Sequence, residues 1–405
     1  MHLTFIRLPA TSLVDPKLRE PFGGAEVRAW TFARTIANHR PHHATLVVRR
    51  RNTATPSRVG NMGVAFVSDR RTSHDRGWSP KLLWQLPQDV SVKAWTSVQK
   101  RFAGEASPRR DFARLEGDVL ATFGLHSPTG AVIRSAHASG RPAIVFLTSD
   151  QEVAFAMGEP AQESRARRRQ LQYREGIQTA DLVIAQTALQ YRLVESDARQ
   201  VIQIRNPIDV DQSDSLPLPM RDRKSVIWIG RADVDCKRAD LCIQVAKRCP
   251  QVPFTMVMNP THKGTKIPSL ADIPSNVRLL DYVPWNEMDP LIRRSLALLN
   301  TSDHEGFPNA FLQAGKLGVP VISRLVNPDE SLTKGLGFFA HGCRDTLVQM
   351  VRTIAAHPER FEAAGRAARG YVVRYHDSRA RGQELLAAAE EISQSRALRC
   401  RRNAS

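Results

Sequence analysis

Strand-like and helical segments alternate along this chain in two series, and the second series starts after a polar, proline-rich stretch near residues 206–219. Apolar runs typical of strands lie in the first series at residues 2–8, 44–48, 63–67, 142–148, 181–185 and 200–204. In the second series they lie at residues 225–230, 253–258, 277–280, 296–300 and 319–323. Strands that alternate with helices form parallel βαβ units. The sequence therefore predicts an α/β protein with two parallel sheets.

The helical spacing of apolar residues places the segments between these strands. Helices are expected at residues 25–39, 110–124, 162–178 and 238–248, and the chain from about 343 onward has a helical pattern. A further strand is expected at 131–134, and residues 68–110 fit an irregular insertion beside a cleft. We expect an N-terminal domain at 1–208, a C-terminal domain at 209–375, and a returning helix with a basic tail at 376–405.

Composition agrees with a two-domain globular protein. The chain has 405 residues, of which 42% are hydrophobic and 24% charged, and these shares argue against disordered and collagen-like classes. No apolar run approaches the ~20 residues of a transmembrane helix. The start of the chain lacks the pattern of a secretory signal, and five cysteines without a C-x-x-C pair fit a reducing compartment. These features predict a cytoplasmic location and give little support to a zinc site.

The chain is strongly basic, with 58 Lys and Arg against 40 Asp and Glu, a net charge of +18. The surplus is larger in the first 200 residues, and basic clusters lie at 49–51, 109–110, 165–169 and 399–402. Such a surplus admits an anionic small molecule, an anionic membrane surface or nucleic acid as the partner. Each cluster fits a solvated face equally well, because charge runs usually face water. Charge alone leaves these classes open.

Open parallel sheets bind ligands at the carboxyl ends of their strands, where loops and helix N-termini present free backbone N–H groups. Three loops of this chain are expected there. The first contains Gly23, Gly24 and Glu26, and its glycines let the backbone approach an anion at the start of a helix. A tight turn between a strand and a helix explains the same glycines equally well.

The second loop follows the strand at 225–230. Arg231 leaves that strand and Lys237 stands at the start of the next helix, so both cations can converge on one diphosphate. Charge-assisted hydrogen bonds of this kind contribute about 1.5 to 3 kcal/mol each. Asp233 and Asp235 have the D-x-D form of a divalent-metal site, but they lie between cations that can neutralise a diphosphate. We therefore expect no metal.

The third loop follows the strand at 296–300 and reads Glu305-Gly306-Phe307-Pro308-Asn309. Pro308 suits the first turn of a helix, so backbone N–H groups along 306–309 are unpaired and available to sugar hydroxyls. Gln313 lies about one turn further along that helix and can face the same pocket. A preference for acids at helix starts would explain the glutamate but not the Gly-Phe-Pro-Asn sequence after it.

Together with residues 276–284, 318–322 and the junction at 206–209, these loops resemble the retaining glycosyltransferases of family 4. The resemblance covers nearly the whole chain and is strongest in the C-terminal half. It implies a GT-B fold, in which two Rossmann-like, doubly wound domains face a central cleft and the last helix crosses back to the first domain. It also implies a nucleoside-diphosphate sugar donor as substrate, with no cofactor and no required metal.

On matching positions, the resemblance implies that Arg231 and Lys237 hold the diphosphate and that Glu305 contacts hydroxyls of the donor sugar. The N–H groups that follow Glu305, in the segment Gly306 to Asn309, would hold the rest of the sugar. Gly23 and Gly24 would approach the diphosphate from the opposite domain.

Two positions depart from the family pattern. The second glutamate of the family, which accepts hydrogen bonds from both ribose hydroxyls, is Gln313 here, and an amide offers one acceptor and two donors. This change predicts altered binding strength or nucleotide preference. Many family members have a histidine near Thr148-Ser149-Asp150. Asp150 is a candidate to orient the acceptor hydroxyl or to take its proton, and capping of the following helix is an equal alternative.

The sequence thus predicts an enzyme that transfers a sugar from a nucleoside diphosphate to a hydroxyl with retention of anomeric configuration. The acceptor, whether glycan, lipid-linked or small molecule, stays open, and the basic N-terminal half suggests peripheral contact with an anionic membrane. The main alternative is a nucleotide-sugar or glycan binding protein without turnover, for which Gln313 is the clue. Nucleic acid is disfavoured because the basic residues lack interleaved aromatics. The motif from Glu305 to Asn309 favours a transferase over a GT-B epimerase.

Overall fold

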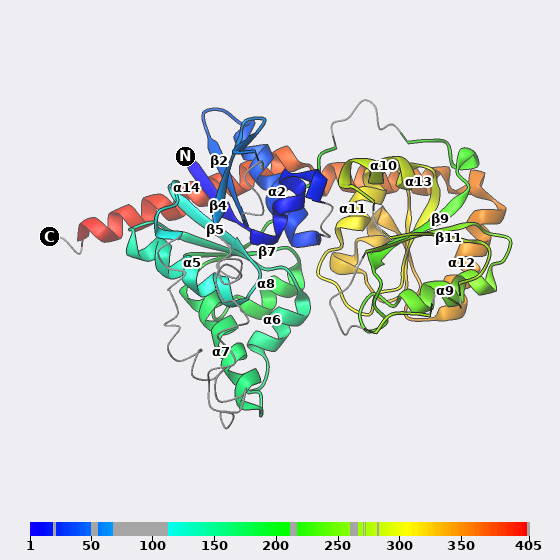
Figure 1. Cartoon of the computed structure of the whole chain (residues 1–405), viewed down its shortest axis with the longest axis horizontal. Helices are drawn as coiled ribbons and strands as arrows, with labels where there is room; N and C mark the ends of the chain where they lie inside the picture. The colour runs from blue at the N-terminus through cyan, green and yellow to red at the C-terminus, as the bar shows by residue number, and fades with distance from the viewer. Residues whose placement is uncertain are drawn as a thin grey trace, which may run out of the picture.

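The computed structural model describes residues 1–18, 22–49, 56–67, 112–210, 217–259, 266–269, 271, 273–281 and 283–402. Strands β1 to β8, from the first 203 residues, form one sheet, and strands β9 to β14, residues 225–339, form another. Figure 1 shows the two sheets in separate lobes, each flanked by helices. The expected insertion at 68–110, the cluster at 109–110 and residues 211–216 of the junction lie outside the described residues.

The first sheet has the strand order β3-β4-β2-β1-β5-β6-β7-β8, and every neighbouring pair is parallel except β3 with β4. The chain order reverses between β1 and β5, so the ligand crevice of such a sheet is expected at their carboxyl ends. The strands are His2–Ile6 (β1), His43–Arg49 (β2), Arg58–Val59 (β3), Met62–Val67 (β4), Val119–Phe123 (β5), Ala143–Phe146 (β6), Leu182–Ala185 (β7) and Val201–Gln203 (β8).

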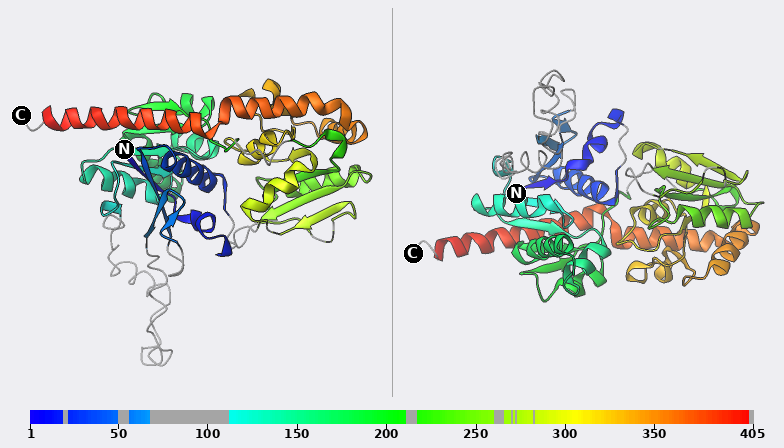
Figure 2. Two further views of the ribbon diagram at one scale, coloured as in Figure 1. Left: turned by 90° about the horizontal axis from the view of Figure 1, so that it is seen from above. Right: turned by 60° about the horizontal axis from the view of Figure 1, so that its bottom comes forward.

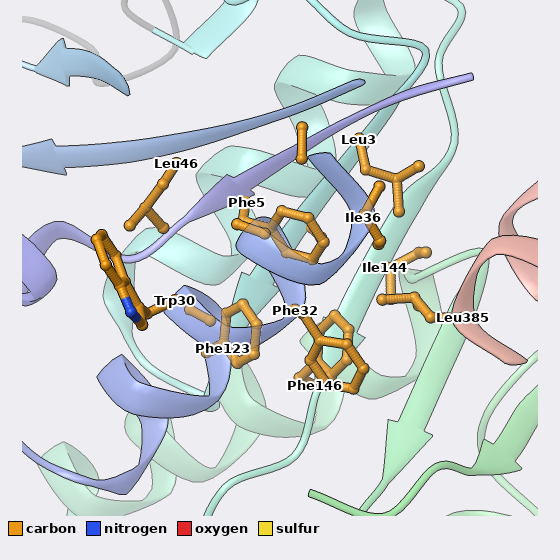
Figure 3. Close-up of a cluster of buried hydrophobic side chains, with 14 of the residues drawn as sticks. Leu3, Phe5, Trp30, Phe32, Ile36, Leu46, Phe123, Ile144, Phe146 and Leu385 are labelled. Atoms are coloured by element: carbon orange, nitrogen blue, oxygen red, sulfur yellow. The ribbon is translucent and has the colours of Figure 1, made fainter. Parts of the chain in front are cut away.

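Helices cover both faces of this sheet. They are the short turns Leu8–Ala10 (η1), Thr11–Val14 (α1) and Pro16–Leu18 (η2), and the helices Gly24–Ala37 (α2), Ser127–Ala138 (α5), Asp150–Met157 (α6), Ser164–Thr179 (α7) and Ala188–Val194 (α8). The core under α2 is aromatic, and the stacked rings of Phe123 and Phe146 lie 4.4 Å apart between centroids. Figure 3 shows these rings with Phe5, Phe32 and Leu385 in one cluster.

Two sequence predictions in this domain are wrong. Residues 119–123 form strand β5 within the segment expected to be a helix at 110–124, and residues 131–134 belong to helix α5 instead of a strand. All five residues of β5 are buried, because a central parallel strand is covered on both faces and shows no alternation. Pro128 opens α5, and Ala131, Val132 and Ala136 form its buried face.

The second sheet is parallel throughout, with the order β11-β10-β9-β12-β13-β14. Its switch in chain order lies between β9 and β12. The strands are Ser225–Arg231 (β9), Phe254–Asn259 (β10), Val277–Leu280 (β11), Ser295–Asn300 (β12), Val321–Ser323 (β13) and Gly337–Phe339 (β14). The helices are Met220–Asp222 (η6), Ala239–Arg248 (α9), Trp285–Arg293 (α10), Asn309–Lys316 (α11), Pro328–Glu330 (η8), Leu332–Leu336 (η9), Arg344–Ala356 (α12), Pro358–Phe361 (η10) and Glu362–His376 (α13).

The last helix, Ser378–Arg402 (α14), returns to the first domain and packs against α2. Figure 2 shows it running along that domain as a single long helix. Its residues Leu385, Ala389 and Ile392 belong to the core of the first sheet. At the junction, the N–H of Ile208 donates to the carbonyl of His376 at 2.8 Å. The two segments of the chain that cross between the domains are therefore hydrogen-bonded to each other. Among the described residues, no helix is long and apolar enough to cross a membrane.

Candidate active site

The three loops expected at strand ends come together where the two domains meet. Asn309, from the third loop, donates through Nδ2 to the carbonyl of Gly24 in the first loop at 2.9 Å. Asn206 reaches the same place, because its Nδ2 donates to the carbonyl of Phe307 at 3.0 Å. The second and third loops lie side by side because β9 and β12 are neighbours in the sheet. The switch point of the second sheet therefore carries both predicted donor-binding loops.

Asp233 anchors the second loop. The residue is 3% exposed, and Oδ1 accepts the backbone N–H groups of Cys236 at 2.8 Å and Lys237 at 2.7 Å. Its Oδ2 lies 3.4 Å from Nε of Arg231, whose side chain is half exposed. Both carboxylate oxygens therefore hold the loop in shape, and the D-x-D pattern has a structural explanation here. In the part of the chain that the structure describes, no cluster of three or more acidic, His or Cys side chains could hold a metal ion.

Lys237 and Glu305 form an ion pair across the β9 and β12 loops. Nζ of Lys237 donates to Oε1 of Glu305, and the hydroxyl of Ser302 donates to the same oxygen at 2.9 Å. The two side chains are 22% and 15% exposed, so both remain accessible to a small molecule. The predicted diphosphate cation and the predicted sugar-binding carboxylate thus neutralise each other in this structure.

A rigid set of contacts fixes Lys237 relative to Glu305. The hydroxyl of Thr301 lies 2.9 Å from the carbonyls of Lys237 and Arg238 and accepts the indole N–H of Trp228 at 2.9 Å. Asp303, two residues before Glu305, pairs with Arg238 and Arg324. Arg238 has a left-handed backbone with φ of 54° just before α9, a conformation that costs free energy in residues other than glycine.

The helix after the third loop begins at Asn309, with Pro308 as its N-cap. Phe307 is 5% exposed and its ring lies 4.6 Å from that of His376, so this side chain packs at the domain junction. Burial lowers the pKa of His376 to about 3, which keeps its ring neutral there. Gln313 is 4% exposed, and among the described residues its buried Nε2 has no hydrogen-bond partner. The buried amide of Gln313, a predicted substrate-binding residue of this helix, can therefore donate further hydrogen bonds.

In the first domain, the carboxylate of Glu26 holds the backbone of Gly23. Its N–H donates to Oε2 of Glu26 at 2.7 Å, and Nε of Arg7 donates to Oε1 at 2.7 Å. Arg7 also lies 2.7 Å from Nε2 of His126, and burial followed by the charge of Arg7 lowers the pKa of that histidine. An arginine only donates, so His126 accepts as a neutral ring. Sequence reasoning missed Arg7 and His126, although both follow the two strands that flank the switch point.

Asp150 is the first residue of α6. Its Oδ1 accepts a hydrogen bond from Nε2 of Gln190 at 2.7 Å, whereas Ser149 occupies the N-cap. Burial raises the pKa of Asp150 to about 6, the bond from Gln190 opposes this rise, and the charges of Asp329 and Glu305 add to it. Its neighbours therefore include the candidate donor site of the other domain.

Gly306, in the third loop, lies close to residues of the first domain. A methyl group at this position would overlap Nε2 of Gln186 and lie 2.8 Å from the carbonyl of Thr148. We expect Gly306→Ala to push the Glu305 loop away from Asp150 and to lower turnover by about 100-fold, as displacements near 1 Å do at catalytic centres. Gly370→Ala is the matched control, because its added methyl meets no atom within 4 Å. Circular dichroism verifies that both variants fold. Equal transfer rates for the two would show that the close packing of Gly306 against the first domain is not needed for turnover.

A family model matches part of the second domain. Residues 223–357, which contain Arg231, Lys237, Glu305 and Gln313, match the family model of glycosyl transferases group 1. No curated protein sequence matches the chain significantly.

Solved structures match over almost the full length. Anabaena HepE in complex with UDP and glucose is 14% identical, with 96% of this chain and 99% of that chain covered at a TM-score of 0.64. Sucrose-phosphate synthase from Thermosynechococcus elongatus is 14% identical, with coverage of 98% and 100% and a TM-score of 0.67. The G117R mutant of S. aureus TarM, in complex with Fondaparinux, alpha-GlcNAc-glycerol and UDP, is 11% identical, with coverage of 96% and 99% and a TM-score of 0.67. The fold is therefore the GT-B fold, with two parallel-sheet, Rossmann-like domains.

Proposed function

We propose that this chain is a retaining glycosyltransferase of family 4 that moves a sugar from a nucleoside diphosphate to a hydroxyl acceptor. The observation that carries the proposal is the Lys237 and Glu305 pair beside Arg231, at the switch point of the domain that matches glycosyl transferases group 1. The structures of HepE with UDP, with UDP and glucose, and with UDP-glucose support a uridine nucleotide sugar as the first donor to test.

The charges of the site suit departure of a diphosphate. As the bond from the anomeric carbon to the phosphate oxygen breaks, its electron pair stays on the diphosphate, and Arg231 and Lys237 stabilise the added charge. A diphosphate that engages Lys237 frees Glu305 to accept hydrogen bonds from sugar hydroxyls. The acceptor oxygen bonds to the same carbon, and Asp150, with its pKa of about 6, is mostly ionised at pH 7 and can take the proton.

Two cations facing the diphosphate make a metal unnecessary in this proposal. Asp233, the better placed acid of the D-x-D pair, has both oxygens bonded to backbone N–H groups or facing Arg231. We therefore propose a reaction without a metal or other cofactor, and chelation with EDTA should leave the rate unchanged.

A panel of nucleotide sugars tests the function. Thermal shift identifies the donor that stabilises the protein, and release of free nucleoside diphosphate then measures turnover with glycan, lipid-linked or small-molecule acceptors. Stabilisation by a donor without any release of diphosphate would favour the binding-protein alternative over the transferase. Anomeric configuration of the product, read by NMR, separates retention from inversion.

The acceptor side of the protein has a basic helix that fits an anionic membrane. On α7, Arg165, Arg167 and Arg168 are exposed and Leu171 is 57% exposed, whereas Gln170 and Ile177 are buried against the domain. Figure 1 shows α7 at the lower end of the first domain. Arginines beside an exposed leucine suit contact with anionic headgroups at the cytoplasmic face of a membrane, at about 1 kcal/mol for each charge near the surface.

We expect Arg167→Glu with Arg168→Glu to weaken binding to anionic vesicles by about 30-fold or more, because at least two such charges are lost. Flotation with vesicles of anionic and of zwitterionic lipid at low salt measures the effect. The double reversal of Arg360 and Arg366, exposed residues of the second domain, changes the net charge equally and is the control. If the wild-type protein does not float with anionic vesicles, the surface of α7 is only solvated.

A further inference from the structure

Gln190 is a fully buried amide that lies behind Asp150. It belongs to the first turn of α8 and is 0% exposed. Its Nε2 donates to Oδ1 of Asp150 at 2.7 Å, and its Oε1 accepts the backbone N–H of Gln186 at 3.1 Å. The hydroxyl of Thr187 accepts the backbone N–H of Gln190 at 3.2 Å and fixes the start of the helix. Every polar group of this side chain is therefore engaged.

The direction of the Gln190 amide follows from its partners. A backbone N–H can only donate, so the side facing Gln186 must be the oxygen, and the nitrogen must face Asp150. A partner that only donates favours a carboxylate over a carboxylic acid, because the ionised form is the stronger acceptor. The hydrogen bond from Gln190 therefore favours the ionised form of Asp150.

This preference acts against the other charges that face Asp150. Burial disfavours its ionised form, and so do the charges of Asp329, in the short turn η8, and of Glu305, in the third loop. Lys237 pairs with Glu305, and Arg205 lies 3.9 Å from Oδ2 of Asp329, so both acids are partly neutralised by their own partners. The bond from Gln190 is the contact that favours ionised Asp150 directly.

The same network touches the donor loop. Nε2 of Gln186 donates to the carbonyl of Thr148 at 2.6 Å, which joins the ends of β7 and β6. Gly306 packs against both of these groups. The segment that orients Asp150 is therefore also the surface on which the Glu305 loop rests.

We infer that Gln190 is a positioning residue that holds the carboxylate of Asp150 ionised and oriented toward the donor loop. This inference rests on the proposed role of Asp150 in handling the acceptor proton. Gln190 itself touches no reacting atom. Its loss removes a hydrogen bond to the charged form and so moves the titration of Asp150 to higher pH.

A substrate-free experiment tests the titration directly. Asp150 has a higher pKa when folded than when unfolded, so the folded state binds more protons between the two values and stability relative to Asp150→Asn falls as pH rises from about 4 to 6. The same difference in stability can be measured between the Gln190→Met variant and the Gln190→Met, Asp150→Asn double variant. We expect it to keep falling with rising pH for about one pH unit further. Identical curves in the two backgrounds would overturn the inference.

Activity gives the second readout. With the donor found by the panel, the acidic limb of the rate profile of Gln190→Met should move up by about one pH unit, so that the rate falls about fivefold at pH 6 and about twofold at pH 7. Gln190→Glu should move it further, because two carboxyl groups then share one proton. Gln170→Met removes another buried glutamine of the same domain and should leave the limb in place.

The two proposals fail in different ways. Full transfer activity in Asp150→Asn would remove the proposed role of Asp150 in the reaction, whatever the stability curves show. A weakened Asp150→Asn variant combined with an unmoved pH limb in Gln190→Met would overturn the positioning role alone.

Discussion

Replacement of Lys237 by alanine should lower the rate of sugar transfer by about 100- to 1,000-fold. In the proposed reaction the departing diphosphate gains negative charge in the transition state, and Lys237 and Arg231 are the cations of the second loop that would stabilise it. The ground-state complex carries less charge on the bridging oxygen, so the loss should appear mainly in kcat. The release of nucleoside diphosphate under saturating donor measures it.

The fold should survive this change. Lys237 is partly exposed, and partly exposed ion pairs contribute only about 0 to 1 kcal/mol to stability. Glu305 keeps the hydrogen bond from Ser302, and Asp233 still binds the backbone of the loop. Lys247→Ala, near the far end of the same helix α9, is the matched control and should keep the wild-type rate. A Lys237→Ala protein with full activity would remove Lys237 from the diphosphate site.

The positions of the candidate donor loops could be predicted because they depend on local signals. A parallel strand followed by a polar loop places that loop at the carboxyl edge of the sheet, whatever the strand order. Gly230 and Arg231 end the apolar strand β9, and residues 305–309 come shortly after the apolar strand β12, so the structure brings both segments to one switch point. Pro308 marked the start of α11 to within one residue.

The remaining contacts depend on the order of the strands, which local patterns do not contain. Arg7 meets His126 because β1 pairs with β5, more than a hundred residues later in the chain. Gln190 meets Asp150 because β6 pairs with β7, which sets α6 beside α8. The misassigned β5 has the same origin, since burial on both faces removes the alternation that identifies a strand.

Arg28 illustrates a residue whose role no sequence pattern reveals, and its removal should cause the largest loss of stability. This arginine of α2 is 2% exposed, and its guanidinium donates to the carbonyls of Leu147 at 2.7 Å and Ile204 at 3.2 Å. Burial lowers its pKa to about 9, so it remains charged at pH 7. It thus supplies hydrogen-bond donors to the backbone carbonyls of the residues that follow β6 and β8. These strands end at the same edge of the sheet as Asp150.

We expect Arg28→Ala to destabilise the protein by about 3 to 5 kcal/mol, because it leaves a cavity and two buried carbonyls without a donor. Arg28→Met keeps most of the side-chain volume beside the Phe146 ring and also removes a charge that is costly to bury, so its loss should be about 1 to 2 kcal/mol. Arg34→Ala, on the same helix with a 42% exposed side chain, should change stability by less than about 1 kcal/mol. Calorimetry of the three variants measures the order of their stability losses.

If Arg28→Met is as destabilising as Arg28→Ala, the hydrogen bonds to the two carbonyls outweigh packing and charge burial at this site. If neither variant unfolds earlier than Arg34→Ala, Arg28 does not hold these strand ends together.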